Sequence, residues 1–127
     1  MIKEIRTSNE LLTLDNDGFV HLRFAEKTTH DINSIKEHLA GVEALDYEGN
    51  CVLLLVHFSN LVGMDKASRK FVNTEKMVLA HKACAMYVTS PLAKLIANFF
   101  LGINRPNFVI SSFTDENSAK EWLLKQK

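Results

Sequence analysis

The chain has 127 residues, a length that suits one domain and is short for two. Apolar residues make up 46% of it and charged residues 24%, which is typical of a globular protein and argues against disorder. Its 15 basic and 15 acidic residues cancel, and a net charge of zero excludes a broad basic surface for nucleic acid or an anionic membrane. We therefore expect a single domain over residues 1–127, with no nucleic-acid partner.

The first part of the chain has the patterns of strands followed by a helix. A weak strand over 2–7 precedes two stronger strands at 11–15 and 19–24, which flank the turn signal Asn16-Asp17-Gly18. From Ile32 to Leu45 the apolar residues recur at steps of three and four, and this predicts a helix. The following run, 51–56, is apolar at every position, which is typical of a central parallel strand covered on both faces.

Helices and strands alternate in the rest of the chain. The pattern predicts a helix from Asp65 to residue 78, a strand at 83–88, and a helix that begins at Ser90-Pro91 and ends near 103. A strand at 108–113 and a final helix, capped by Thr114 and docked through Trp122 and Leu123, complete the chain. The sequence therefore predicts an α/β fold, with a mixed, mostly parallel sheet, an N-terminal antiparallel hairpin and about four helices.

Motifs of metal, cofactor or catalytic sites do not occur. Cys51 and Cys84 lie far apart inside apolar runs, as buried free thiols do, and the five histidines form no HxxxH pair. The sequence contains no GxSxG elbow, P-loop or GxGxxG fingerprint. We therefore expect no metal, no cofactor and no enzyme activity. No apolar run reaches about 18 residues, so we expect no transmembrane segment and a cytoplasmic protein.

Several short motifs stand out, mainly in the second half of the chain: Met64-Asp65, 89–94, 98–101, 103–106, 113–116 and 121–123. Together they resemble small uncharacterised bacterial proteins with a STAS-like fold, named after sulfate transporters and anti-sigma-factor antagonists. The resemblance implies a mixed sheet with helices and a non-catalytic regulatory module that binds a protein partner.

The resemblance also identifies a departure from the family pattern. In anti-sigma-factor antagonists an Asp-Ser pair at a helix start carries the regulatory phosphoserine. In this chain Asp65 is followed by Lys66, and the next serine, Ser68, lies beyond the matching position. The resemblance therefore implies a module without the serine phosphorylation switch.

A small anionic or lipid-like ligand at the strand ends is the alternative function. His57 follows the central apolar strand, where ligands gather in open α/β sheets, and it titrates near neutrality in its usual state. The helix start at Asp65 offers backbone N–H groups and a positive dipole end. The ligand-binding residues expected for this function are His57, Ser59, Asp65, Lys66 and Arg69.

An apolar patch on the helix that begins at Ser90 is the expected interaction surface. On a helical wheel Phe100 lies at the edge of the buried stripe and Leu101 on the opposite side, with Ala97 nearby. Exposed apolar residues that cluster in this way are typical of a contact with a partner. We therefore expect Ala97, Phe100 and Leu101 to contact another protein or a second copy of this chain in a homodimer.

Overall fold

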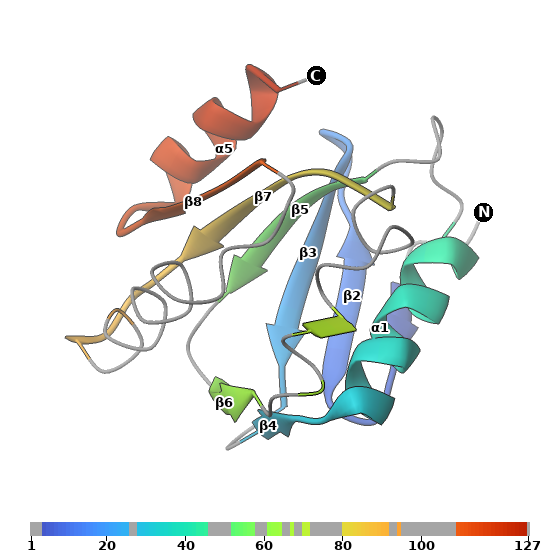
Figure 1. The fold of residues 1–127 in the computed structure, drawn as a ribbon. Helices are drawn as coiled ribbons and strands as arrows, with labels where there is room; N and C mark the ends of the chain where they lie inside the picture. The colour runs from blue at the N-terminus through green and yellow to red at the C-terminus, as the bar shows by residue number, and fades with distance from the viewer. Residues whose placement is uncertain are drawn as a thin grey trace.

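The structure, a computed structural model, describes residues 4–25, 28–45, 52–57, 61–64, 67, 70–71, 80–91, 94 and 109–126. Six strands form the main sheet in the order β1-β2-β3-β5-β7-β8, and β4 and β6 form a second, two-stranded sheet (Figure 1). The strands are β1 (Glu4–Arg6), β2 (Glu10–Leu14), β3 (Phe19–Phe24), β4 (Thr28–His30), β5 (Val52–His57), β6 (Leu61–Met64), β7 (His81–Tyr87) and β8 (Val109–Phe113), and the helices are α1 (Ile32–Ala44) and α5 (Glu116–Leu124).

The main sheet is antiparallel at its N-terminal edge and parallel elsewhere. β1, β2 and β3 pair antiparallel, whereas β3, β5, β7 and β8 are parallel neighbours. The β2–β3 hairpin turns at Gly18, whose φ of 88° suits glycine because it has no Cβ. The predicted mixed, mostly parallel sheet with its N-terminal hairpin is therefore confirmed. β4 and β6 were not predicted, because strands of three and four residues are too short to show a period.

Alternate side chains of β5 contribute to two separate cores. Val52, Leu54 and Val56 pack on the face that also receives Val42 of α1. Leu53 and Leu55 pack on the other face, against α5. All five of these β5 side chains are buried, so β5 is the central strand covered on both faces that the sequence predicted.

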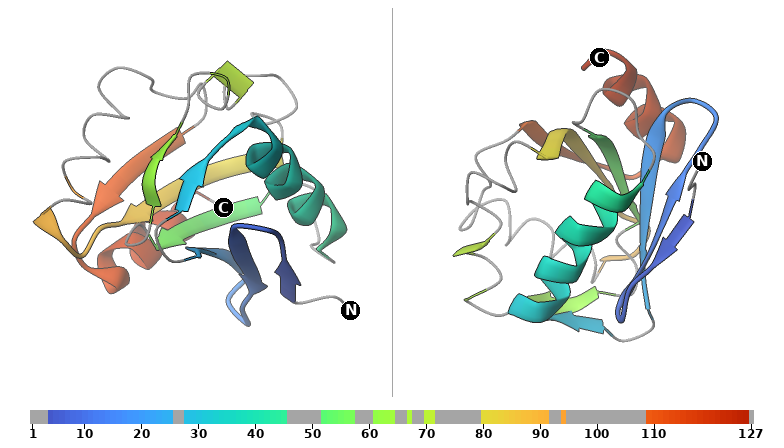
Figure 2. Two further views of the ribbon diagram at one scale, coloured as in Figure 1. Left: turned by 90° about the horizontal axis from the view of Figure 1, so that it is seen from below. Right: turned by 90° about the vertical axis from the view of Figure 1, so that its right-hand side faces the viewer.

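The helix α5 covers the face of the sheet opposite α1 (Figure 2). Its Ala119 and Leu123 are completely buried, and the ring of Trp122 lies 5.6 Å from that of Phe113. The predicted docking of the last helix through Trp122 and Leu123 is thus confirmed. Its cap is Asp115 rather than Thr114, since the Asp115 side chain accepts a hydrogen bond from the Ser118 N–H. This makes Glu116 the first helical residue.

Two complete helices are described, where the sequence predicted about four. The predicted helices over 65–78 and 90–103 lie mostly outside the described residues. Within them Ala67, Lys70 and Phe71 are helical, and so are Pro91 and Lys94. The Lys94 N–H donates to the Ser90 carbonyl at 2.9 Å, which is the first bond of a helix that begins after Ser90. Among the described helices, none combines the length and the apolar character needed to cross a membrane.

Candidate functional site

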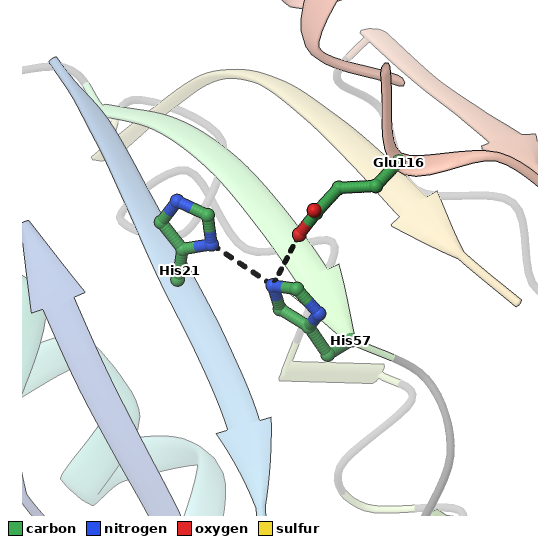
Figure 3. A group of neighbouring side chains, drawn as sticks. All are labelled: His21, His57 and Glu116. Atoms are coloured by element: carbon green, nitrogen blue, oxygen red, sulfur yellow. Dashed lines mark hydrogen bonds and ion pairs between the residues drawn. The ribbon is translucent and has the colours of Figure 1, made fainter. Parts of the chain in front are cut away.

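A polar cluster lies at one edge of the core beneath α5. Its members are His21 in the middle of β3, His57 at the end of β5, and Glu116 at the start of α5. In the parallel β3–β5 pair, His21 is opposite Leu55 and Arg23 is opposite His57. His21 and His57 are therefore diagonal neighbours on the same face of the sheet, and Glu116 reaches them from the helix (Figure 3).

The two imidazole rings are in direct contact. His21 Nδ1 and His57 Nε2 are 2.9 Å apart, and the ring centroids are 5.2 Å apart in a stacked arrangement. Glu116 Oε1 lies 3.7 Å from the same His57 Nε2. On its far side His57 meets the ring of Tyr87 edge-on, at a centroid separation of 5.7 Å. The cluster is partly open to solvent, because the side chain of His57 is 13% exposed and that of Glu116 is 38% exposed.

Asp15 sets the proton arrangement of His21. Its Oδ2 lies 2.6 Å from His21 Nε2, while its Oδ1 accepts hydrogen bonds from the backbone N–H groups of Asp17 and Phe19. Burial by itself raises the pKa of Asp15, but the Phe19 N–H and the His21 ring outweigh it, so the pKa lies below its usual 3.8. Asp15 is therefore ionised at neutral pH and holds a proton on His21 Nε2, which leaves Nδ1 as the acceptor in the neutral ring.

His57 is neutral at physiological pH. Burial, and then the positive charge of Arg23, lower the pKa of His57 from 6.5 to about 4, while the nearby Glu116 carboxylate opposes the shift only in part. The neutral ring has one N–H, and the 2.9 Å contact assigns it to Nε2, which donates to His21 Nδ1. A continuous chain of hydrogen bonds therefore runs from His57 through His21 to Asp15.

A second histidine pair lies on the other face of the sheet, under α1. His38 Nδ1 is 2.8 Å from Glu10 Oε1, and His38 Nε2 is 3.0 Å from His81 Nε2. All three residues are buried. Here the carboxylate and the second imidazole contact opposite sides of one ring, so the three groups form a line and do not converge.

A cavity of about 340 Å³ opens at the carboxyl ends of β7 and β8, beside the start of α5. The cavity and the polar cluster share neighbouring residues in the sequence, because Asp115 lines the cavity and Glu116 belongs to the cluster. A basic side chain, three hydroxyl groups and two apolar side chains line it together with Asp115: Lys94, Ser112, Thr114, Ser118, Val88 and Phe113.

Of the ligand-binding residues expected from sequence, His57 is described and ends β5, as predicted. Ser59, Asp65, Lys66 and Arg69 lie outside the described residues, and so do Ala97, Phe100 and Leu101 of the expected interaction surface. The sequence reasoning did not single out His21, Asp15 and Glu116 as partners of His57. His21 itself was a signal in the sequence for such a site, because it is a polar residue on the same strand face as the apolar Phe19.

Comparisons with known proteins support the fold. A structure search finds an uncharacterized protein of the DUF3478 family from Shewanella loihica PV-4, with a SpoIIAA-like fold. The match has a TM-score of 0.53 and 17% sequence identity, and it covers 97% of this chain and 92% of the other. The fold is therefore SpoIIAA-like, which is the STAS-like fold that the motifs indicated. No curated protein matches the sequence. The family described as a domain of unknown function, DUF7793, matches residues 12–127, and the chain belongs to that family.

Proposed function

We propose that this chain is a STAS-type regulatory module that acts by binding a protein partner and catalyses no reaction itself. The observation that carries the proposal is the SpoIIAA-like fold, which extends over 97% of the chain. The sequence motifs that resemble STAS-like proteins support it independently. Because one fold hosts many functions, the proposal has to be tested at the region where such modules are regulated.

The resemblance places the regulated region at Asp65-Lys66, which lie outside the described residues. The described residues on either side are Met64, which ends β6, and Ala67, which is helical. A lysine at the position of the phosphorylated serine keeps its positive charge, and it is not phosphorylated in the way that a serine is. We therefore propose that partner binding at this junction is constitutive and favours an acidic surface on the partner.

The state of Cys84 supports a non-catalytic role. The thiol is buried in β7, and burial raises its pKa to about 12. It is therefore protonated at neutral pH, whereas a nucleophilic cysteine requires the thiolate. Cys51, the other cysteine, lies outside the described residues.

Affinity capture followed by binding measurements with purified proteins tests the proposal. The tagged full chain is expressed in its own host, captured proteins are identified by mass spectrometry, and each candidate is then titrated calorimetrically. Lys66→Glu should weaken the complex by about tenfold or more, since a like charge facing an acidic surface costs binding energy. Lys82→Glu is the matched control, because it makes the same charge reversal at an exposed lysine of β7. Equal affinities of the two variants, or no partner that binds when purified, would contradict the proposal.

Binding of a small anionic or lipid-like ligand at the strand ends is the second candidate function. The cavity of about 340 Å³ favours it, since this volume is within the range of ligand pockets and Lys94 supplies a positive charge. Inorganic phosphate is the first probe: it should shift the amide NMR signals of Ser112 and Ser118 in a saturable way, and Lys94→Gln should abolish the shifts. Shifts that survive in Lys94→Gln would count against this candidate.

A further inference from the structure

We propose that His21, His57 and Glu116 bind a divalent transition-metal ion of the zinc type, with Asp15 as the outer-sphere partner that orients His21. The inference is independent of the proposed regulatory function, because it rests only on how β3, β5 and α5 bring these side chains together.

The three ligand atoms converge on one point. His21 Nδ1, His57 Nε2 and a Glu116 oxygen all lie within 4.8 Å of one another, with separations of 2.9 Å between the nitrogens and 3.7 Å between His57 Nε2 and the carboxylate. Around a tetrahedral zinc ion with bonds of about 2.05 Å, neighbouring ligand atoms are about 3.3 Å apart. Two of the three separations are therefore within about 0.4 Å of the zinc value, and the third, between His21 and the Glu116 carboxylate, is no more than 4.8 Å. Three ligands of this kind leave the fourth position for water.

Asp15 supplies a second, independent indication. Histidine ligands of metals almost always donate their other ring N–H to a carboxylate or carbonyl, which orients the ring and raises its basicity. Asp15 Oδ2 accepts from His21 Nε2 at 2.6 Å, and Asp15 is itself held by the backbone N–H groups of Asp17 and Phe19. The lone pair of His21 is thereby placed on Nδ1, on the side of His57 and Glu116.

The ligand types and the charges select the class of ion. Two imidazole nitrogens and one carboxylate suit Zn²⁺ and related transition ions, whereas Mg²⁺ and Ca²⁺ prefer oxygen ligands only. Binding requires His57 to change tautomer: solvent takes the proton from Nε2 and returns one to Nδ1, so that the Nε2 lone pair faces the ion and no net proton is released. Asp15 and Glu116 offset the ion's two charges, and Arg23 and Lys120, whose positive charges act on His57, oppose it.

The second histidine cluster lacks this geometry. Glu10 and His81 lie on opposite sides of the His38 ring, so their atoms do not meet at a common point, and the site is buried from solvent. Among the described residues, His21, His57 and Glu116 are the one group of three that satisfies the distances for a metal site. The accessible cluster is therefore the one assigned to the ion.

Titration of the chelator-treated full chain with Zn²⁺, followed by calorimetry, tests the proposal, and Co²⁺ absorption reports the ligand set. We expect one ion per chain and a higher melting temperature with Zn²⁺. Glu116→Gln should weaken binding at least tenfold, whereas Glu121→Gln, the same change at an exposed position of α5, should leave it unchanged. Asp15→Asn should weaken binding by about 10- to 100-fold and alter the Co²⁺ spectrum. Glu43→Gln, which removes a carboxylate charge at an exposed position of α1, should do neither.

Melting curves without metal show that each variant is folded before its affinity is interpreted. The proposal is overturned if the folded wild-type chain shows no saturable binding of Zn²⁺. It is also overturned if Glu116→Gln binds as tightly as wild type, or if His38→Gln abolishes binding while Glu116→Gln does not. The first result would attribute the cluster to hydrogen bonding alone, and the other two would place the ion elsewhere.

Discussion

Acidification from pH 7.5 to 4.5 should destabilise the metal-free chain through His57. In the folded chain burial and the charge of Arg23 lower the pKa of His57 to about 4, while in the unfolded chain it is close to 6.5. Between these two values the unfolded chain binds more protons than the folded one, so the free energy of unfolding falls as the pH falls. The contribution of His57 is complete above pH 6.5 and is lost as the pH approaches 4.

The magnitude follows from the two pKa values. The difference between 6.5 and about 4 corresponds to a stabilisation of at most about 3 kcal/mol, at about 1.4 kcal/mol per pH unit. The side chain of His57 is 13% exposed and adjoins the more exposed Glu116, so solvent screening reduces this maximum. We expect a loss of about 1–3 kcal/mol. Asp15 acts in a different window: because its pKa is lowered below 3.8, its contribution is lost only at still lower pH.

Urea unfolding in the presence of a chelator, at pH values from 7.5 to 4.5, measures how the free energy of unfolding depends on pH. His57→Gln should make this dependence weaker than it is in wild type. Parallel pH profiles of wild type and His57→Gln would refute the reasoning.

A second measurement isolates the effect of a neighbouring charge on the pKa of His57. In an NMR titration, Lys120→Gln should raise this pKa, because the positive charge of Lys120 helps to lower it. Lys125→Gln, an exposed position on the same chain segment, serves as the control.

Three further predictions concern the core, the thiol and the assembly. Leu123→Ala should lower the free energy of unfolding by about 2–5 kcal/mol, because Leu123 is completely buried, whereas Leu124→Ala, at a 49% exposed neighbour, should change it by less than about 1 kcal/mol; urea unfolding compares the two. Cys84 should resist iodoacetamide at pH 8 in the folded chain and react in urea, as mapped by mass spectrometry. Light scattering should give about twice the monomer mass, and Leu101→Lys should shift the chain towards monomer; a wild-type monomer at high micromolar concentration rejects the homodimer.

Both faces of β5 are apolar and need a cover, which either the last helix or a second subunit would supply. In the structure α5 covers the second face, with Ala119 and Leu123 packed against Leu53 and Leu55. A second subunit is therefore not required for that purpose. The homodimer prediction now depends on the apolar character of Phe100 and Leu101, which lie outside the described residues.

The sequence by itself determined the element types and the class of fold. Strands β2, β3, β5, β7 and β8 and helix α1 follow the predicted ranges to within about two residues. Each of them has a local signal: the alternation in β3, the continuous apolar run of β5, and the three- and four-residue steps of α1. These periods arise from backbone geometry and burial within one segment, so they can be read without knowing which segments meet.

The polar cluster depended on contacts between distant segments. His21 and His57 are 36 positions apart, and the parallel pairing of β3 with β5, in the register that places Arg23 opposite His57, makes them diagonal neighbours. Glu116 joins them because α5 folds over the same face. A shift of one residue in the β3–β5 register would turn the imidazoles to opposite faces of the sheet. Register and helix docking depend on the whole packed core, and therefore spacing along the chain did not reveal this site.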